Sequence, residues 1–595
     1  MFKRTHNCNE LKAANIGQSV TVCGWVNSSR NLGGMIFLDL RDREGITQLF
    51  IDPAKTPDIA AVAKDIREEW VISASGVVRP RPAEMINRSR ATGEIELEVT
   101  ELTVLNKALP MPFHLDDPAV SDDLKLKYRY LDMRRSGLVQ NLRLRHRMAQ
   151  VMRRVFDDNG FVEVETPILS KSTPEGARDY LVPSRVRPGT FYALPQAPQQ
   201  YKQLLMVGGL ERYYQIARCF RDEDLRADRQ PEFTQIDLEM SFVDQDDVIA
   251  VTEKLVAAVV KEVRGLEVKT PFERMTWKDA MEYYGSDKPD RRFGLLLHTL
   301  DKVLSTSEFR PFAEALASGK TIRGFNAAGQ AAAFSRKALD ELTATAKLFG
   351  ASGLVWLKVE DGGQLAGSAA KFLTEAEKAA LLQELEAKAG DLLLIVADSW
   401  RVASEALGRL RLEVGAKAGL IDEKALNFLW VVEFPLLEWD DEEQRYAPVH
   451  HPFTSPMEED VCKLETAPGE VRAIAYDIVL NGIELGGGSI RIHNPERQAQ
   501  MFRILGISQE QAKLRFGHLL EAFSFGAPPH GGLALGFDRF AMLMCGAKSI
   551  REVIAFPKTA KACCLMTDSP SDVDDKQLEE LHIRLADDVT EQPQA

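Results

Sequence analysis

The sequence predicts a multidomain α+β protein, and three observations support that fold class. The chain has 595 residues, which is too long for a single hydrophobic core and suggests three to five domains. Residues 19–104 show short alternating strands separated by turns, whereas residues 288–412 combine alanine- and leucine-rich helices with strands. Between these regions, residues 216–237 form two alternating segments joined by a charged loop, which predicts an antiparallel strand pair.

The composition is that of an ordinary globular protein, with 45% hydrophobic and 27% charged residues. No run approaches the roughly 18 apolar residues of a membrane span, and the first residues lack the apolar core of a signal peptide. The seven cysteines are scattered without a CxxC pair, which favours reduced thiols and argues against a zinc site. We therefore expect a cytoplasmic protein with no membrane partner.

The formal net charge of −14 is unevenly distributed. Residues 1–108 hold 14 basic and 14 acidic side chains, and residues 121–154 hold ten basic and three acidic ones. Residues 568–595 hold nine acidic and two basic side chains. A basic segment beside a neutral module suits a nucleic-acid backbone, although charge runs are more often solvated surfaces.

The first region predicts a five-stranded barrel. The expected strands are Val20–Val26, Met35–Leu40, Thr47–Ile51, Val71–Val78 and Glu94–Val104. A helix over Asp58–Glu69 follows the third strand. Five strands with a helix in this place are the signature of an OB-fold barrel, which reads single-stranded bases by stacking and by hydrogen bonds to base edges.

A proline-containing hinge and a long helix follow the barrel. Pro110 and Pro112 disfavour helix, so residues 109–135 are predicted to be a hinge. Arg143–Asn159 has the pattern of an amphipathic helix, and Gly160 is a suitable residue to end it. A strand is expected to follow and to end at Pro167.

The predicted strand pair carries charged side chains on its faces. Residues two apart share a face, so Arg221 and Glu223 point one way, while Phe233, Gln235 and Asp237 line one face of the partner strand. Buried charges require partners, so this arrangement is either a salt-bridged strand pair or a binding site.

A second sheet segment predicts a carboxylate pair. Asn481-Gly482 between alternating apolar runs predicts a two-residue type I′ hairpin turn. That register places Asp477 diagonal to Glu484 on one face, where two carboxylates suit an Mg²⁺ ion bridging phosphates. The alternative is a pair of solvent-facing acids. Residues 486–488 are three glycines, which indicates a bulge or a close approach to a ligand.

Three segments in order, Phe161–Pro167, Ile216–Asp237 and Gly531–Arg539, resemble the signature motifs of class II aminoacyl-tRNA synthetases. The runs STPEGARDY, QAPQQYKQLLM, FRDEDLRADRQPEFTQID and GIELGGGSIRIHN are similar to the bacterial type of aspartyl-tRNA synthetase, and the resemblance covers nearly the whole chain. It implies a homodimeric ligase that activates L-aspartate with ATP and Mg²⁺ and transfers it to the 3′ end of tRNA-Asp.

The resemblance also implies a division into domains. They are an OB-fold anticodon-binding domain (1–108), a hinge (109–135), a catalytic domain in two parts (136–287 and 413–562) built on an antiparallel sheet, an α+β insertion (288–412) and an acidic C-terminal extension (563–595). We assign no catalytic role to the insertion.

For the nucleotide, the resemblance implies that Arg221 holds the α-phosphate and Arg539 the γ-phosphate, and that both are catalytic. Asp477 and Glu484 would hold Mg²⁺. The further residues of the ATP site are Asp222, Glu223, Gln230, Phe233, Gly536, Phe537 and Asp538.

For the amino acid, Lys202 and Arg491 would face the side-chain carboxylate of aspartate, with Asp237 orienting them. A neutral asparagine would leave these cations unpaired. The remaining members of this subsite are Glu175, Gln199, Arg221 and His450. In the barrel, the resemblance assigns Arg30, Phe37 and Gln48 to the anticodon.

Several alternatives stay open. The first is a ligase that charges both tRNA-Asp and tRNA-Asn, although the apolar Leu32 in the first barrel loop favours the strict form. The second is an asparaginyl-tRNA synthetase, against which Lys202, Arg491 and the insertion argue. A catalytically inactive RNA-binding paralogue would be expected to lack one of the motif arginines, and an asparagine synthetase that does not use tRNA would lack the barrel.

Overall fold

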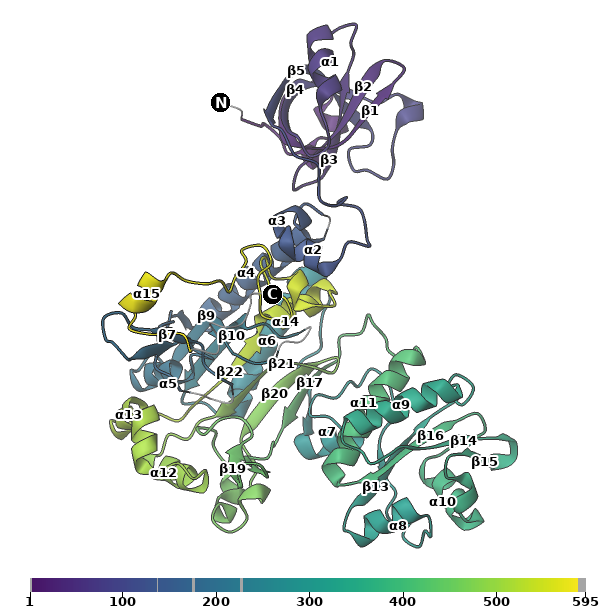
Figure 1. Ribbon diagram of the computed structural model, residues 1–595, viewed down its shortest axis with the longest axis vertical. Coiled ribbons are helices and arrows are strands. Elements are labelled where there is room, and N and C mark those ends of the chain that lie inside the picture. The colour runs from purple at the N-terminus through teal and green to yellow at the C-terminus, as the bar shows by residue number, and fades with distance from the viewer. Residues whose placement is uncertain (1–2, 136, 174–176, 225–227, 587–595) are drawn as a thin grey trace. The chain divides into compact units, whose positions relative to one another are not determined.

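The structure is a computed structural model, and it describes residues 3–135, 137–173, 177–224 and 228–586 (Figure 1). Its contacts divide the chain into two compact units, residues 1–142 with 564–568 and residues 143–563 with 569–595. Each unit has hydrophobic cores of its own.

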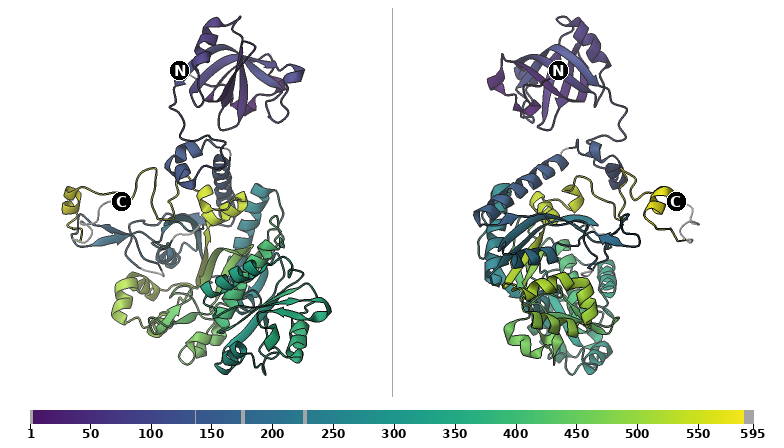
Figure 2. Two further views of the ribbon diagram at one scale, coloured as in Figure 1. Left: turned by 45° about the vertical axis from the view of Figure 1, so that its right-hand side comes forward. Right: turned by 90° about the vertical axis from the view of Figure 1, so that its left-hand side faces the viewer.

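A closed five-stranded barrel forms most of the first unit (Figure 2). In barrel order its strands are β1 (Ser19–Leu32), β2 (Met35–Arg41), β3 (Ile46–Ile51), β5 (Ile95–Asn106) and β4 (Val71–Pro80). Helix α1 (Pro57–Asp65) follows the third strand as expected but ends four residues before the predicted boundary. Alternation directs residues such as Val22, Leu38 and Leu49 into the barrel interior. The predicted OB-fold is therefore confirmed.

The predicted hinge is more regular than expected. It contains two short helices, α2 (Asp122–Lys127) and α3 (Arg129–Asp132). The hydroxyl of Ser121 accepts a hydrogen bond from the backbone N–H of Leu124 at 3.3 Å and so caps the first helix. The two prolines that disfavour helix lie upstream of this cap and leave the basic stretch free to be helical.

An eight-stranded sheet organises the second unit. In order its strands are β11 (Glu273–Thr276), β17 (Phe428–Val432), β20 (Ala475–Leu480), β21 (Ile483–Ile490), β22 (His530–Gly536), β10 (Glu232–Ser241), β9 (Arg212–Phe220) and β6 (Val162–Glu163). The six central strands are antiparallel, whereas each outermost strand pairs in parallel with its neighbour. The predicted pair is β9 with β10, and β22 lies on the other side of β10.

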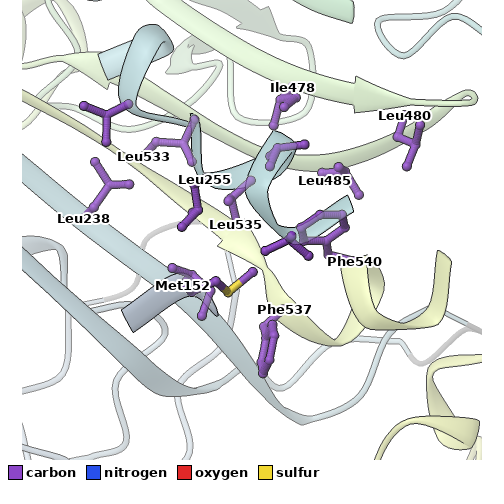
Figure 3. Packing of buried hydrophobic residues seen from close by; sticks show 14 of the residues in the cluster. Met152, Leu238, Leu255, Ile478, Leu480, Leu485, Leu533, Leu535, Phe537 and Phe540 are labelled. Atoms are coloured by element: carbon purple, nitrogen blue, oxygen red, sulfur yellow. The ribbon is translucent and has the colours of Figure 1, made fainter. Parts of the chain in front are cut away.

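One face of this sheet carries the main hydrophobic core. Ile478, Leu485 and Leu535 converge from three adjacent strands, and the core also receives side chains from helices (Figure 3). The covering helices are α4 (Leu138–Asp158), α6 (Gln245–Arg264) and α14 (Phe537–Cys545). Because alternate residues of a strand face opposite sides, the other face is left for polar side chains.

Helix α4 and its following strand differ in length from the prediction. The helix begins at Leu138, five residues before the predicted start, and Gly160 at φ +75° follows its end. The strand that was expected to reach Pro167 is only two residues long as β6.

The insertion forms an α+β layer structure (Figure 1). Its sheet order is β12 (His298–Thr299), β13 (Thr321–Ala327), β16 (Leu392–Asp398), β14 (Val355–Val359) and β15 (Leu365–Gly367). Its helices are α8 (Arg310–Ala317), α9 (Arg336–Leu348), α10 (Glu375–Glu384) and α11 (Trp400–Lys417). Helices α9 and α11 share a hydrophobic cluster with one face of the sheet, and α8 and α10 share a second cluster with the other face.

The remaining helices and strands are peripheral. They are β7 (Leu181–Pro183), β8 (Phe191–Ala193), α5 (Gln199–Val207), α7 (Trp277–Tyr284), β18 (Leu437–Asp440), β19 (Arg445–Pro448), α12 (Pro495–Ile504), α13 (Gln509–Ser524) and α15 (Asp575–Glu580). In the part of the chain that the structure describes, no helix combines the length and the apolar character needed to cross a membrane.

Candidate active site

A cavity of about 510 Å³ lies on the sheet face opposite the main core. Ala534 and Gly536 of β22 line it, whereas the alternate residues Leu533 and Leu535 point into the core. Most of the predicted site residues line this cavity: Gln199, Lys202, Arg221, Glu223, Gln230, Phe233, Asp237, His450, Asp477, Glu484, Arg491, Gly536, Asp538 and Arg539.

Two of the described residues predicted for the active site, Phe537 and Asp222, are not among the lining. Phe537 is 3% exposed and packs in the main core, with the guanidinium of Arg145 4.5 Å from its ring centre. Asp222 forms an ion pair with Arg178 at 3.2 Å and does not line the cavity. Glu175 lies outside the described residues. The side chain of Phe537 is therefore structural, and its prediction as a nucleotide contact can apply only to its backbone.

Four buried charged side chains form one end of the cavity. The ammonium of Lys202 lies 2.8 Å from Asp237 Oδ1 and 3.2 Å from Glu239 Oε2. Nε and Nη2 of Arg491 donate to the two carboxylate oxygens of Glu239, at 2.9 and 3.0 Å. All four side chains are at most 2% exposed. The four charges alternate in sign, so each cation has a fixed counter-charge.

The pKa values of the two carboxylates in this cluster are shifted in opposite directions. Burial raises the pKa of Asp237, and the neighbouring Lys202 compensates only in part. Burial also acts on Glu239, but Arg491 and Lys202 outweigh it and lower the pKa of Glu239 to about 2. Glu239 is therefore a permanent anion at this end of the cavity.

Glu239 and His451 are members of the cluster that the sequence analysis missed. Glu239 lies two residues beyond Asp237 on β10, so the period of two that selected Asp237 also points to Glu239. His451 contacts Arg491 at 2.7 Å, and burial with this guanidinium lowers its pKa well below the usual range. A neutral His451 accepts a hydrogen bond from Arg491. The sequence analysis named the neighbouring His450 instead, whereas the histidine that contacts the arginine is His451.

Helix α5 supplies the side of the cavity next to this cluster. Lys202 and Gln203 lie three and four residues after Gln199, which places all three on one helix face. Gln199 donates to Gln203 at 3.2 Å, and Gln203 in turn contacts His530 at 3.1 Å. This chain of contacts connects the helix to β22.

The other end of the cavity contains two arginines from different segments. Arg221 follows directly after the last residue of β9, and its guanidinium lies 5.2 Å from the ring centre of Phe233. Arg539, in the first turn of α14, donates to the carbonyl oxygen of Glu484 at 2.6 Å. Within the described residues, the Nε atoms of both arginines are buried and have no hydrogen-bond partner. This end can therefore accept further oxygen ligands.

Three further predicted residues at this end already have partners. Glu223 forms an ion pair with Arg229 at 3.0 Å. Gln230 exchanges two hydrogen bonds with the backbone of Lys558. Asp538 pairs with Arg145 and accepts from the backbone N–H of Thr234 at 2.7 Å, which ties the start of α14 to β10.

The hairpin β20–β21 brings the two predicted carboxylates to the same cavity. Asn481 and Gly482 have φ of +54° and +80°, in agreement with the predicted turn. The register is regular only up to Val479 opposite Glu484, and a β-bulge follows. Asp477 consequently lies opposite Gly487, one position further than the regular register predicts. A Cβ on Gly487 would come within 2.2 Å of Asp477 Oδ1, which explains a glycine there.

Asp477 has an unusual environment. Burial raises its pKa to about 6, and the charges of Glu484 and Asp287 act in the same direction, against His450. His450 Nε2 lies 3.5 Å from Asp477 Oδ1, and this oxygen has no hydrogen-bond partner in the described residues. A buried carboxylate oxygen without a donor is suited to a cation.

The barrel in the first unit has a largely buried polar network that reaches the surface at Arg30. Arg30 donates to Asp39 at 3.1 Å and to Gln48 at 3.3 Å, and Gln48 donates to Glu96 at 2.7 Å. Phe37 lies opposite Arg30 in the strand register, and its ring meets that of Phe50 edge to face. The three residues predicted for the anticodon are thus neighbours. Asp39 and Glu96, which orient them, were not predicted.

Comparisons with known proteins agree with this arrangement. A family model described as "tRNA synthetases class II (D, K and N)" matches residues 121–560, and one described as "OB-fold nucleic acid binding domain" matches residues 20–105. An "Aspartate--tRNA(Asp/Asn) ligase" from Desulfatibacillum aliphaticivorans is 54% identical over 588 residues, covering 99% of this chain and 98% of the relative. An "Aspartate--tRNA ligase" from Bacillus licheniformis is 54% identical over 587 residues, covering 98% and 99%.

A solved structure supports the same fold. The asparaginyl-tRNA synthetase from Pyrococcus horikoshii, crystallised with asparaginyl-adenylate, superposes with a TM-score of 0.59. The match covers 94% of this chain and 99% of that chain at 19% identity. At this identity the likeness concerns the fold alone.

Proposed function

This chain belongs to the class II tRNA synthetases of the aspartate, lysine and asparagine group, and on that premise we propose how its residues carry out aspartate–tRNA ligation. It is an aspartate–tRNA ligase of the bacterial type, as its relatives at 54% identity over nearly their whole length indicate. The family uses ATP. The assignment of individual residues below is our proposal.

The reaction has two steps. The substrate carboxylate attacks the α-phosphorus of ATP, which gives aspartyl-adenylate and pyrophosphate. The 3′-terminal hydroxyl of the tRNA then attacks the acyl carbon and releases AMP. The attacking carboxylate is ionised at neutral pH, so the first step needs no general base. Catalysis must come from aligning the reactants and from stabilising charge on the phosphoryl group.

We assign the phosphates to the end of the cavity that contains Arg221 and Arg539. Guanidinium groups bind phosphate oxygens in a forked geometry, and both Nε donors are free in the described residues. Phe233 lies beside Arg221 and would stack on the adenine, with Glu223 accepting from its amino group. Gln230, fixed to the backbone of Lys558, lines the same cavity and is assigned to the nucleotide as well.

Asp477 and Glu484 fit a magnesium ion. Mg²⁺ typically takes one or two protein carboxylates, and its other ligands are water and substrate phosphates. Both side chains line the cavity, and Asp477 offers a buried oxygen without a donor. When bound, the metal would neutralise phosphate charge and orient the pyrophosphate leaving group. The two carboxylates would supply the negative charge that holds it.

We assign the aspartate side chain to Lys202 and Arg491. These two cations are buried and held in place by Asp237 and Glu239, so an incoming carboxylate meets fixed positive charge. A neutral amide does not carry the negative charge that a carboxylate offers to these two cations, and such mismatches can give about 10⁴-fold discrimination. Gln199 and His450 would contact the α-amino end of the substrate.

The single observation that carries this assignment is that one cavity contains both sets of cations. Arg221 and Arg539 line the same 510 Å³ space as Lys202 and Arg491. A nucleotide and a dicarboxylic amino acid can therefore meet there. The decisive assay is ATP–pyrophosphate exchange. We expect exchange to depend on aspartate, and exchange driven equally well by asparagine would refute the assignment.

We further propose the strict form, which charges tRNA-Asp only. Relatives of similar identity carry both names, so the comparisons leave this point open. Leu32 ends β1 and is 55% exposed, and an apolar side chain there would contact the anticodon without hydrogen bonding. Aspartylation of purified tRNA-Asn at a rate similar to that of tRNA-Asp would favour the relaxed form instead.

We also propose a cytoplasmic homodimer. Val162, Ile168 and Leu169 are exposed apolar residues after α4, the region that resembles the dimerisation element of class II enzymes. Sedimentation equilibrium at micromolar concentration should give twice the chain mass, and a monomer would contradict the proposal.

A further inference from the structure

The tip of the β20–β21 hairpin contacts the two segments that connect the insertion to the catalytic sheet. The segment leading into the insertion is residues 287–295, and the one leading out is residues 422–427; together we call them the insertion root. The hairpin carries Asp477 on one strand and Glu484 on the other. The root therefore lies at the turn between the two carboxylates assigned to the metal.

The leaving segment is bonded to the turn through Asn481. The Oδ1 atom of Asn481 accepts from the backbone N–H of Asn427 at 2.9 Å, and its Nδ2 donates to the carbonyl of Ala425 at 2.7 Å. The backbone N–H of Asn481 also donates to the carbonyl of Asn427 at 3.2 Å. One side chain thus ties the turn to the leaving segment at two points.

The incoming segment contacts the other residue of the turn. A Cβ built on Gly482 would lie 2.9 Å from the Cβ of Asp290 and 3.4 Å from its Cα. Such a distance leaves no room for a side chain, so the turn and the segment touch backbone to backbone. The two residues of one turn therefore contact both halves of the root.

Asp290 itself is held in place by two arginines. Its carboxylate, on a residue only 3% exposed, accepts from Arg292 Nε at 3.0 Å and Nη2 at 2.7 Å. Its backbone carbonyl accepts from Arg411 Nη2 at 2.8 Å. Arg292 also lies 3.4 Å from the carbonyl of Asp422 and so links the two segments to each other.

Arg411 organises the incoming segment from inside the insertion. It lies on α11, is 1% exposed, and donates to the carbonyls of Asp290, Phe293, Gly294 and Leu295. Its guanidinium lies 4.1 Å from the ring centre of Phe293. It makes no ion pair in the described residues, and burial lowers its pKa to about 10. Because all the hydrogen bonds that the structure describes for this buried guanidinium go to backbone carbonyls, Arg411 fixes the backbone path of the incoming segment.

The same segment reaches the cavity. Asp287 lines it together with Asp477 and Glu484, and the ammonium of Lys288 lies 4.0 Å from Glu484 Oε2. The incoming segment therefore contacts the hairpin at its turn and meets one carboxylate near its end. No residue of the root was predicted to belong to the site.

We propose that the insertion root positions the β20–β21 hairpin for the nucleotide, so that Asp290, Arg292 and Arg411 are positioning residues of the adenylation step. The inference rests on the proposed role of Asp477 and Glu484 and extends it to the insertion. The two strands of the hairpin pair with β17 and β22, but the turn extends beyond these strands and is held by the root. A displacement of about 1 Å in such a group can cost on the order of 10²-fold in rate.

The test is Asp290→Asn, which keeps the shape of the side chain and weakens its pairing with Arg292. We expect the Mg²⁺ concentration for half-maximal ATP–pyrophosphate exchange to rise about 10-fold, the effect typical of losing a partner behind a metal ligand. The KM for aspartate should stay unchanged. In the ligand-free protein, backbone amides of residues 479–486 should exchange hydrogen faster.

Asp391→Asn is the matched control. Asp391 is a similarly buried carboxylate of the insertion, at 6% exposure, and its bonds go to Asn326, Gly329 and Lys388, all within the insertion. This variant should leave both the Mg²⁺ dependence and the hairpin exchange unchanged. If the root only fastens the insertion, the two variants will behave alike, and the inference falls.

A second variant covers the case in which Asp290→Asn does not fold. Asn481→Asp keeps a residue that tolerates positive φ but removes the donor to Ala425, and it should shift both readouts in the same direction by a smaller factor. Unchanged readouts in this variant would overturn the inference. Glu484→Gln separates the two claims: if it leaves the Mg²⁺ dependence intact, the metal assignment fails, while hydrogen exchange still tests the root.

Discussion

The two ends of the cavity are built in opposite ways. At the amino-acid end, Lys202 and Arg491 are completely buried and paired with two carboxylates before any substrate is present. At the phosphate end, Arg221 and Arg539 keep buried Nε atoms without partners in the described residues, and Asp477 keeps an oxygen without one. The charged groups of the first end are all paired within the protein, whereas the second end keeps unpaired groups that the proposed nucleotide and metal would bind.

This difference separates selectivity from catalysis. A preformed charge cluster discriminates between amino acids, because its donors cannot move to accommodate a neutral side chain. Unpaired donors at the phosphate end bind charge that develops during the reaction, without first breaking protein contacts. Substitutions at the first end should therefore affect stability and activity together, and those at the second end mainly activity.

The largest effect should come from Lys202→Met. This change leaves Asp237 and Glu239 with one cation fewer in a buried site, and breaking such a network typically costs about 3–5 kcal/mol of unfolding free energy. Urea denaturation should report that loss, together with loss of aspartate-dependent exchange. Lys358→Met, which removes a donor to a backbone carbonyl only, is the control. Wild-type stability in Lys202→Met would mean that the cluster is not preformed.

Next in size, Arg221→Ala and Arg539→Ala should lower the exchange rate by about 10²–10³-fold, the usual cost of losing a donor to transition-state charge. The urea midpoint of Arg221→Ala should stay close to wild type, because its buried Nε donor has no partner to lose in the described residues. Arg539→Ala also loses its bonds to the carbonyl of Glu484 and to Asp228, so its midpoint should fall slightly. Arg212→Ala, an exposed arginine at the far end of β9, should change neither quantity. Full exchange activity in Arg221→Ala would refute the phosphate assignment.

Two glycines allow a matched comparison with smaller effects. A Cβ on Gly532 would lie 2.1 Å from Glu239 Oε2 and 2.1 Å from a backbone carbonyl, so Gly532→Ala should lower stability by about 1–3 kcal/mol. A Cβ on Gly487 would displace Asp477 instead, and Gly487→Ala should raise the half-saturating Mg²⁺ concentration about 10-fold. A Cβ on Gly353 would have no neighbour within 4 Å, so Gly353→Ala should change neither stability nor the Mg²⁺ dependence. Equal effects of the first two on stability would contradict the comparison.

The smallest expected effect is a pH dependence confined to the phosphate end. Burial raises the pKa of Asp477 to about 6, so this carboxyl keeps its proton at pH values where an ordinary aspartate is ionised. Metal binding needs the ionised form, so the half-saturating Mg²⁺ concentration should rise about 4-fold as pH falls from 7.5 to 5.5. Saturating Mg²⁺ should remove this dependence. A flat profile would show that Asp477 does not titrate in this range.

The sequence predicts those parts of the site that depend on local patterns. Alternation places Phe233 and Asp237 on one face of β10, and Asn481-Gly482 specifies the turn that brings Asp477 and Glu484 together. Each of these inferences uses residues within about ten positions of one another. The resemblance to a family then supplied roles that no local pattern contains.

What the sequence could not predict depends on contacts between distant segments. Glu239 pairs with an arginine 252 residues away, and the partners of Arg411 lie more than 110 residues before it. The bulge after Val479 depends on how β21 fits against β22 as well as β20. Helices α2 and α3 were missed because nearby prolines outweighed a local cap at Ser121.

The order of strands in the main sheet has a consequence for how the chain is made. Strand β10 pairs with β22, which begins about 290 residues later, so at roughly 5–20 residues per second the ribosome needs about 15–60 seconds to deliver the partner. During that interval one edge of β10 has no strand to bond with, and open edges invite misassembly between nascent chains. The insertion emerges in the same interval with a sheet and cores of its own, so it is placed to fold before the catalytic sheet around it closes.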